Sequence, residues 1–218
     1  MKKEDILKVI KELKEKSKKR NFKQSFDLIV VLKGLNLKKP EEQVEFFQPL
    51  KHDLGKQLKI CALVGPELAG KSKDLCDFIV KDDEFPKYAK DKKATKKLAK
   101  ECGWFIAQAN LMPKIAASFG RVLGPKGKMP NPKAGCIVPP TANLKPLCDR
   151  LRKTVKVSAK TVPTIQCIVG KEDMKDEDVT DNIWTIYDGL VHHLPSGKDN
   201  VRNVLLKLTM GKPINLEK

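Results

Sequence analysis

Short apolar runs alternate with helical stripes between residues 58 and 151, and this alternation limits the fold more than any other feature. Three of the runs are typical of buried strands, namely residues 58–64, 78–80 and 104–107. A Lys-rich helical segment covers residues 94–100, and a second stripe over 144–151 follows Asn143, a good N-cap residue. Strands that alternate with helices favour a mostly parallel sheet wrapped by helices. We therefore expect the middle of the chain to form an α/β domain.

The two ends of the chain have a different texture. Ile6, Ile10 and Leu13 recur at helical spacing and predict an amphipathic helix that ends near residues 17–21. The other elements expected at the two ends are strands at residues 26–32, 44–50, 155–159, 165–169 and 201–208, and a helix whose stripe covers 179–190. The acidic residues 176–178 precede that last stripe, where a helix dipole favours negative charge.

The charge balance points to a polyanionic partner. The chain carries 44 Lys and Arg against 27 Asp and Glu, a formal net charge of +17. A chain this basic usually meets nucleic acid, and the alternative is a solvated cationic face. Residues 55–154 carry a net charge of +12, residues 1–54 carry +5, and residues 155–218 carry none. The middle of the chain therefore differs in kind from its ends.

Cysteine and histidine placement gives no sign of a metal site. The six cysteines form no C-x-x-C pair, and none lies beside one of the three histidines, so we expect reduced core thiols and no cofactor. His192 and His193 lie at an expected helix end, where a capping role is favoured, and we expect no catalytic residues. No apolar run approaches the roughly 20 residues that span a bilayer. These features favour a cytoplasmic protein that binds no membrane.

The segment KICALVGPELAGKSKD, residues 59–74, contains the G-x-x-x-x-G-K-[ST] pattern of a phosphate-binding loop. The residues that supply this pattern are Gly65, Gly70, Lys71 and Ser72. Only about two helical turns fit before Phe78, and the strand at 104–107 ends without the carboxylate that Mg²⁺ needs. Asp82 and Asp83 remain candidates for a metal ligand. We interpret the pattern as a coincidence, with a nucleotide hydrolase as the alternative.

A second glycine-rich segment, FGRVLGPKGKMPNPKAG, covers residues 119–135. It contains four glycines, three prolines and four basic residues in 17 positions, and no acidic residue lies between Glu101 and Asp149. Glycine allows close backbone approach, and proline stiffens the loop. A rigid cationic loop of this kind suits a phosphate backbone, and the alternative is an ordinary surface loop.

Residues 120–135 resemble the signature of the L-one (stalk) family of large-subunit ribosomal proteins. Phe22-Lys23-Gln24-Ser25 is similar to the Phe-led rRNA-contact segment of that family. Thr209-Met210-Gly211, followed by Lys212-Pro213, resembles its Thr-Met-Gly motif. The resemblance covers essentially the whole chain in order, and the form of the Phe22 segment looks archaeal.

The resemblance implies a two-domain α/β architecture. Residues 1–54 together with 155–218 are expected to form an rRNA-binding end domain with an antiparallel sheet and two helices. Residues 55–154 are expected to form an inserted Rossmann-like domain with a parallel sheet, joined through hinges near 51–56 and 153–155. The family has no phosphate-loop function at the position of Gly65 to Ser72, which agrees with a coincidental pattern.

The resemblance also implies a function without catalysis. The protein is expected to be a structural constituent of the large subunit that binds large-subunit rRNA and forms the mobile stalk near the tRNA exit site. It is further expected to assist release of deacylated exit-site tRNA and to repress translation by binding its own mRNA. The free protein is expected to be a monomer, located in the cytoplasm and on the ribosome.

The resemblance assigns the RNA contacts to two groups of residues. The implied rRNA-binding residues are Phe22, Gln24, Ser25, Thr209, Met210 and Gly211. The implied basic-loop residues are Arg121, Gly124, Pro125, Lys126, Gly127, Lys128 and Lys133. For Phe22 and Met210 the alternative is packing in the core. Charge alone favours the middle domain as the main RNA binder, but recognition of a folded RNA depends on shape and 2′-hydroxyl contacts, so we follow the resemblance.

Overall fold

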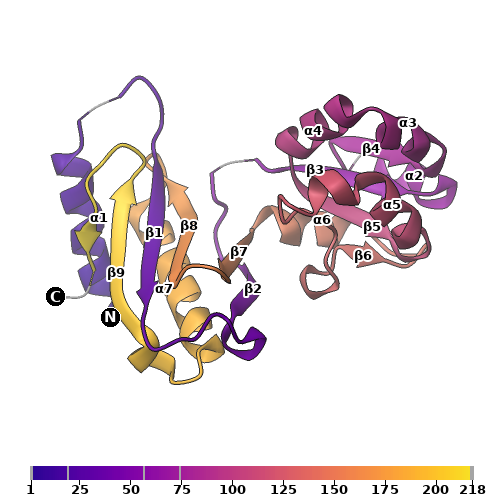
Figure 1. Ribbon diagram of the computed structural model, residues 1–218. Helices are drawn as coiled ribbons and strands as arrows, with labels where there is room; N and C mark the ends of the chain where they lie inside the picture. The colour runs from indigo at the N-terminus through magenta and orange to yellow at the C-terminus, as the bar shows by residue number, and fades with distance from the viewer. Residues whose placement is uncertain (1, 19, 56, 74, 217–218) are drawn as a thin grey trace. The chain divides into compact units, whose positions relative to one another are not determined.

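The computed structural model describes residues 2–18, 20–55, 57–73 and 75–216, which divide into two compact units (Figure 1). The terminal unit comprises residues 1–56 and 153–218, and the central unit comprises residues 57–152. The terminal unit contains antiparallel sheets and the central unit a parallel one. The expected α/β fold class, with antiparallel pairing in one unit and a parallel sheet in the other, is therefore confirmed.

The main sheet of the terminal unit has the strand order β10-β9-β1-β8. Its strands are β1 (Ser25–Leu32), β8 (Thr164–Lys171), β9 (Val201–Leu208) and β10 (Ile214–Asn215). A separate two-stranded sheet pairs β2 (Val44–Pro49) with β7 (Thr154–Ala159). Side chains of β1 are alternately half-buried and buried, so Phe26, Leu28 and Val30 face the core. The other face of β1 is more open.

Two helices pack on the buried face of this sheet, α1 (Lys3–Lys16) and α7 (Asp176–His193) (Figure 1). The apolar stripe predicted on α1 is buried, and so are Val179, Ile183, Ile186 and Leu190 of α7. Lys3 forms an ion pair with Asp181 at 2.6 Å, and Lys14 forms one with Asp176 at 2.5 Å. Because these pairs are partly exposed, burial of the two stripes contributes more to holding the helices together.

The central unit contains one parallel sheet with the strand order β4-β3-β5-β6. Its strands are β3 (Lys59–Val64), β4 (Phe78–Lys81), β5 (Cys102–Gln108) and β6 (Ile137–Val138). Its helices are α2 (Pro66–Ser72), α3 (Phe85–Lys90), α4 (Lys92–Glu101), α5 (Met112–Leu123) and α6 (Lys145–Arg152). Cys61 and Leu63 of β3 belong to the core under α3, α4 and α5, while Ile60 and Ala62 are fully buried on the other face. The sheet is thus covered on both faces, as parallel sheets require.

Phe119 lies at the centre of the core formed by α3, α4 and α5. Its side chain is fully buried and meets Phe85 edge-on, with ring centroids 5.5 Å apart. Tyr88 contributes a second, tilted ring at 5.6 Å. The two phenylalanines also contact the buried strand residues that carry the sheet. This core lies wholly within the central unit.

The two chain segments that connect the units start at neighbouring positions of the terminal unit. Pro49 lies opposite Thr154 at the end of the β2–β7 ladder, and the Leu50 amide donates to the Lys153 carbonyl at 2.9 Å. The buried Asn182 accepts a hydrogen bond from the His52 amide at 3.2 Å. Hydrogen bonds of its backbone amides therefore fix the first connection to the terminal unit as far as His52. Lys56, within the first expected hinge, lies outside the described residues.

Loss of the Phe119 ring is expected to destabilise the central unit alone. Phe119→Ala removes a fully buried ring, so the free energy of unfolding of that unit should fall by about 3–5 kcal/mol. Each unit holds one of the two tryptophans, Trp104 in β5 and Trp184 in α7, so urea unfolding can be followed separately in Trp104→Phe and Trp184→Phe backgrounds. Equal shifts for both reporters would show instead that the two units unfold as one.

Candidate nucleic-acid interface

The start of β1 and the end of β9 meet at one edge of the main sheet. Phe26 lies opposite Leu208 in the antiparallel pairing of the two strands. Beyond that pair, the Thr209 amide donates to the Ser25 carbonyl at 3.1 Å, and the Thr209 hydroxyl oxygen accepts from the Ser25 amide at 3.0 Å. The same hydroxyl lies 3.3 Å from the Ser25 carbonyl, to which it donates. Two motifs more than 180 residues apart thus become one sheet edge.

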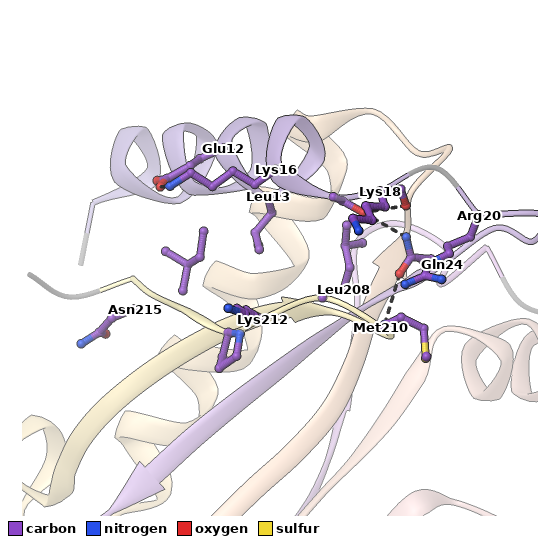
Figure 2. A pocket seen from close by; sticks show the side chains of 14 residues that line it. Glu12, Leu13, Lys16, Lys18, Arg20, Gln24, Leu208, Met210, Lys212 and Asn215 are labelled. Carbon is purple, nitrogen blue, oxygen red and sulfur yellow. Dashed lines mark hydrogen bonds and ion pairs between the residues drawn. The ribbon is translucent and has the colours of Figure 1, made fainter.

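Gln24 holds this edge together from inside. Its side chain is only 1% exposed. The Oε1 atom accepts from the Met210 amide at 3.1 Å, and Nε2 donates to the Ser17 hydroxyl at 3.1 Å (Figure 2). The Gln24 carbonyl accepts from the Glu172 amide at 2.9 Å. Gln24 is therefore a positioning residue that links the end of α1, the turn that follows β8 and the end of β9.

Phe22 and Met210 are exposed at this edge. The two residues are 52% and 62% exposed, which excludes the alternative that either packs in the core. Gly211 follows in a tight turn in which its amide donates to the Leu208 carbonyl at 2.8 Å. A Cβ atom at Gly211 would lie 3.3 Å from the Leu208 Cβ, so a larger residue would push against the strand end. The edge therefore presents a ring and a thioether on a closely packed backbone.

A groove of about 740 Å³ runs between α1 and the turn that joins β9 to β10 (Figure 2). Leu13 and Leu208 are buried along its apolar side. Lys18, Arg20 and Lys212 are exposed along its rim, and none of the three forms an ion pair within the part of the chain that the structure describes. An apolar groove with a cationic rim can accept sugars and bases while its rim meets phosphates.

The rim was missed by sequence reasoning, although the signal was present. Lys18 and Arg20 precede Phe22 almost directly, and Lys212 follows Gly211. The neighbouring Lys19 lies outside the described residues. Lys23 donates to the exposed Asp173 carboxylate at 2.5 Å, and this hydrogen bond holds the pKa of that carboxyl below its usual value. The charge of Lys23 is thus partly neutralised by Asp173, while the cations of the rim can form ion pairs with a bound ligand.

The basic loop predicted at residues 119–135 is partly helical. Its first five residues, 119–123, form the last turns of α5, and Gly127 and Gly135 adopt positive φ angles of 62° and 75°. The Lys128 ammonium donates to the carbonyls of Ala99 and Cys102 at 2.8 and 2.7 Å, so this lysine anchors the loop on the end of α4. The predicted loop residues that are exposed are Arg121, Gly124, Pro125, Lys126, Gly127 and Lys133.

The phosphate-loop pattern does not form a loop. Helix α2 begins at Pro66, directly after Gly65, so the residues that would cradle a phosphate are already helical and bond to one another. Gly70 lies inside this helix, and the fully buried Ser72 hydroxyl donates to the Leu68 carbonyl at 2.7 Å. The side chain of Lys71 lies outside what the structure describes. The interpretation of the pattern as a coincidence therefore has a physical basis in the position of α2.

The cysteines are free, buried thiols. Burial raises the pKa of Cys136 to about 11 and that of Cys167 to about 12, so both stay protonated and unreactive at neutral pH. Within residues 2–18, 20–55, 57–73 and 75–216, no three His, Cys, Asp or Glu side chains gather in a way that could hold a metal ion. No helix in the same ranges is long and apolar enough to cross a membrane.

The terminal unit has an exposed edge that is both apolar and cationic, and the central unit is strongly basic. This combination is typical of nucleic-acid-binding proteins. Comparison with known proteins identifies the group within that class. The chain belongs to the ribosomal protein L1p/L10e family, whose model matches residues 13–212. This membership confirms the resemblance and, with it, the prediction of an RNA-binding ribosomal protein that is not an enzyme.

Its relatives include archaeal proteins named large ribosomal subunit protein uL1. The relative from Methanothermococcus thermolithotrophicus is 40% identical over 218 residues, which cover 100% of both chains. The relative from Methanobrevibacter smithii is 41% identical over 209 residues, covering 95% of this chain and 96% of that protein. The relative from Pyrococcus horikoshii is 37% identical over 213 residues, covering 97% and 95%. The similarity thus extends over both units.

Substitution of Gly70 distinguishes a helix from a phosphate loop. A Cβ atom at Gly70 meets nothing within 4 Å, so Gly70→Ala should stabilise the central unit by about 0.5–1 kcal/mol and leave RNA binding unchanged. Gly65→Ala is the matched control, because its Cβ would lie 3.1 Å from Gln108 Oε1, the acceptor of the Gly65 amide, and should destabilise the unit. Urea unfolding followed by Trp104 fluorescence measures both. ATP or GTP hydrolysis that Gly70→Ala abolishes would contradict this assignment.

Proposed function

We propose that this protein is a component of the large ribosomal subunit and binds large-subunit rRNA with the sheet edge formed by residues 22–25 and 209–211. The observation that carries the proposal is the pairing of β1 with β9, which brings both motifs to one edge and leaves Phe22 and Met210 exposed there. The names of the relatives, and the near-complete coverage of both chains, support the assignment to the large subunit.

The chemistry of the edge suits a folded RNA. A phenylalanine ring can stack on a base or sugar, and a methionine side chain adapts to an irregular apolar surface. Thr209 and Ser25 keep acceptor capacity on their hydroxyls for 2′-hydroxyl groups, while Lys18, Arg20 and Lys212 can meet phosphates along the groove rim. Gly211 lets the RNA backbone approach the turn closely. Recognition by this edge would therefore depend more on the shape of the RNA than on its net charge.

Gln24 acts in this proposal through the groups it positions. Its buried amide fixes the Met210 backbone on one side and Ser17 on the other. Loss of the amide would free the turn at 209–211 from the end of α1. The predicted role of Gln24 at the rRNA site is thus retained as an indirect one.

The more detailed roles follow from the family resemblance. We propose that the protein forms the mobile stalk near the tRNA exit site and assists release of deacylated tRNA. The exposed cations Arg121, Lys126 and Lys133 of the central unit are the side chains that we assign to the tRNA. Repression of its own mRNA requires only that the message carry a structure similar to the rRNA site, because the same sheet edge would bind both. We also propose that the two units are separate folding domains with hinges between them.

Met210→Ala is expected to weaken binding to the cognate rRNA at least tenfold without changing stability. The side chain is exposed, so its loss removes contact with RNA while leaving the core intact. Val162→Ala is the matched control, because Val162 is a similarly exposed apolar residue of the same unit, outside the edge. Filter binding to the rRNA fragment and to an unrelated RNA duplex, with thermal unfolding of each variant, measures the effect. Equal affinities for the two variants would refute the assignment of the edge.

Thr209→Ala is expected to reduce rRNA affinity by about 1–3 kcal/mol, whereas Thr209→Ser should restore most of it. Alanine removes a hydroxyl that is exposed at the edge and leaves the RNA group that it would bond unpaired in the complex, whereas serine keeps this hydroxyl. Isothermal titration with the rRNA fragment measures the difference. If Thr209→Ser binds as poorly as Thr209→Ala, the methyl group rather than the hydroxyl carries the contact.

A further inference from the structure

Helix α4 has a solvent face made of lysines. Its exposed residues include Lys92, Lys93, Lys96, Lys97 and Lys100, and its buried face is formed by Thr95, Leu98 and Ala99. The buried face anchors the helix on the core of the central unit, since Leu98 and Ala99 belong to the cluster around Phe119. The lysines are therefore held on one side of a fixed helix.

Several charges of α4 oppose its dipole. The first turn of a helix favours acidic residues and the last turn basic ones. The two helices of the terminal unit follow this rule, with Glu4 and Asp5 in the first turn of α1 and residues 176–178 in the first turn of α7. In α4 the first turn holds lysines and no acidic residue, and the helix ends at Glu101, whereas the Asp91 N-cap and Lys100 in the last turn have the favourable sign. The lysines of the first turn and Glu101 therefore work against the dipole, and helix stability does not explain them.

Repulsion along the helix adds to this cost. The pairs Lys92–Lys96, Lys93–Lys97 and Lys96–Lys100 are like charges four residues apart, which repel. None of these five lysines forms an ion pair with a carboxylate among the described residues. Two acids flank these lysines in sequence. Asp91 uses its carboxylate as the N-cap and accepts from the amides of residues 93 and 94 at 2.9 and 3.1 Å, and Glu101 forms no ion pair with them among the described residues. The lysine face is thus left without ion-paired counter-charges.

The lysine face continues into the basic loop. Lys128 fixes that loop to the C-terminal end of α4 through the carbonyls of Ala99 and Cys102. Lys126, two residues earlier, is exposed. A segment distant in sequence is thus anchored at the end of α4 and adds an exposed cation to the central unit. Charge that opposes local stability and gathers on one rigid surface is typical of a binding function.

We propose that the exposed face of α4 binds the phosphate backbone of double-stranded RNA and forms a second RNA contact, distinct from the sheet edge. The inference rests on the proposed function, since it takes RNA to be the polyanion. Lysine ammonium groups meet phosphates as point charges and read no bases, so this contact is independent of sequence and sensitive to salt. The partner's charge would relieve the repulsion along α4.

The test removes three charges from one stripe of α4. Lys92→Gln/Lys96→Gln/Lys100→Gln keeps good helix formers at all three positions. The matched control is Lys73→Gln/Lys81→Gln/Lys145→Gln, which removes three exposed lysines from other elements of the central unit. Both triple variants and the wild type are titrated, as full chains, against the cognate rRNA fragment and a 20-base-pair RNA duplex of unrelated sequence from 50 to 300 mM salt.

The α4 variant should lower the slope of log affinity against log salt by about two to three units on both probes, since each lost phosphate contact removes nearly one unit. The control variant should change the slope by less than about one unit. The melting temperature of the α4 variant should be equal to or higher than that of the wild type, because the repulsion is removed. This last readout separates lost RNA contacts from lost folding.

Three results would overturn the inference. An unchanged slope for the α4 variant would mean that the face binds no RNA and leaves an acidic protein as its partner. Equal slope changes for the two triple variants would mean that only net charge matters. A lower melting temperature for the α4 variant would mean that the lysines serve stability. A wild-type protein without preference for the rRNA fragment would instead contradict the proposed function, while a reduced slope on the unrelated duplex would still support the α4 contact.

Discussion

The pairing of β1 with β9 is the constraint on which the terminal unit depends. It places Phe26 opposite Leu208 and so fixes which side chains of both strands face α1 and α7. A shift of one residue would turn the buried set of β1 to the open face, which the apolar stripes of the two helices oppose. The same register brings Ser25 to Thr209, so the core and the candidate interface are specified by one set of backbone hydrogen bonds.

Specificity and charge are divided between the two units. The sheet edge offers a ring, a thioether and a tight turn beside a groove whose rim carries Lys18, Arg20 and Lys212, and so it can distinguish one RNA shape from another. The central unit has most of the net charge, and its α4 shows how that charge is displayed on a rigid element, while Lys128 anchors the basic loop at the end of that helix. Non-specific attraction by one unit and shape recognition by the other can combine, because backbone contacts raise affinity without adding sequence information.

Much of the fold could be predicted because local sequence patterns determine its helices and strands. The helical spacing of Ile6, Ile10 and Leu13 predicted a helix, and the branched apolar residues in the run at 201–208 predicted a strand. The structure has a helix and a strand at these positions. The two motifs of the interface were found through the family resemblance. The roles of Gln24 and Lys128 could not be predicted, since each depends on hydrogen bonds to residues far away in the sequence. The start of α2 at Pro66 was also not predicted, because the glycine-lysine pattern at residues 65–72 is compatible with either a phosphate loop or a helix.

The hydrogen bond between Leu50 and Lys153 has a consequence for the order of folding. It closes the whole central unit into a single long loop between two neighbouring strands. The residues of the central unit are contiguous, so this unit can fold as soon as its own segment has left the ribosome. The sheet of the terminal unit cannot be completed before β9 has been synthesised, and its first strand waits for partners more than 130 residues later. A central unit that has already folded is more compact than the same segment unfolded, which reduces the chain entropy lost when the strands finally meet.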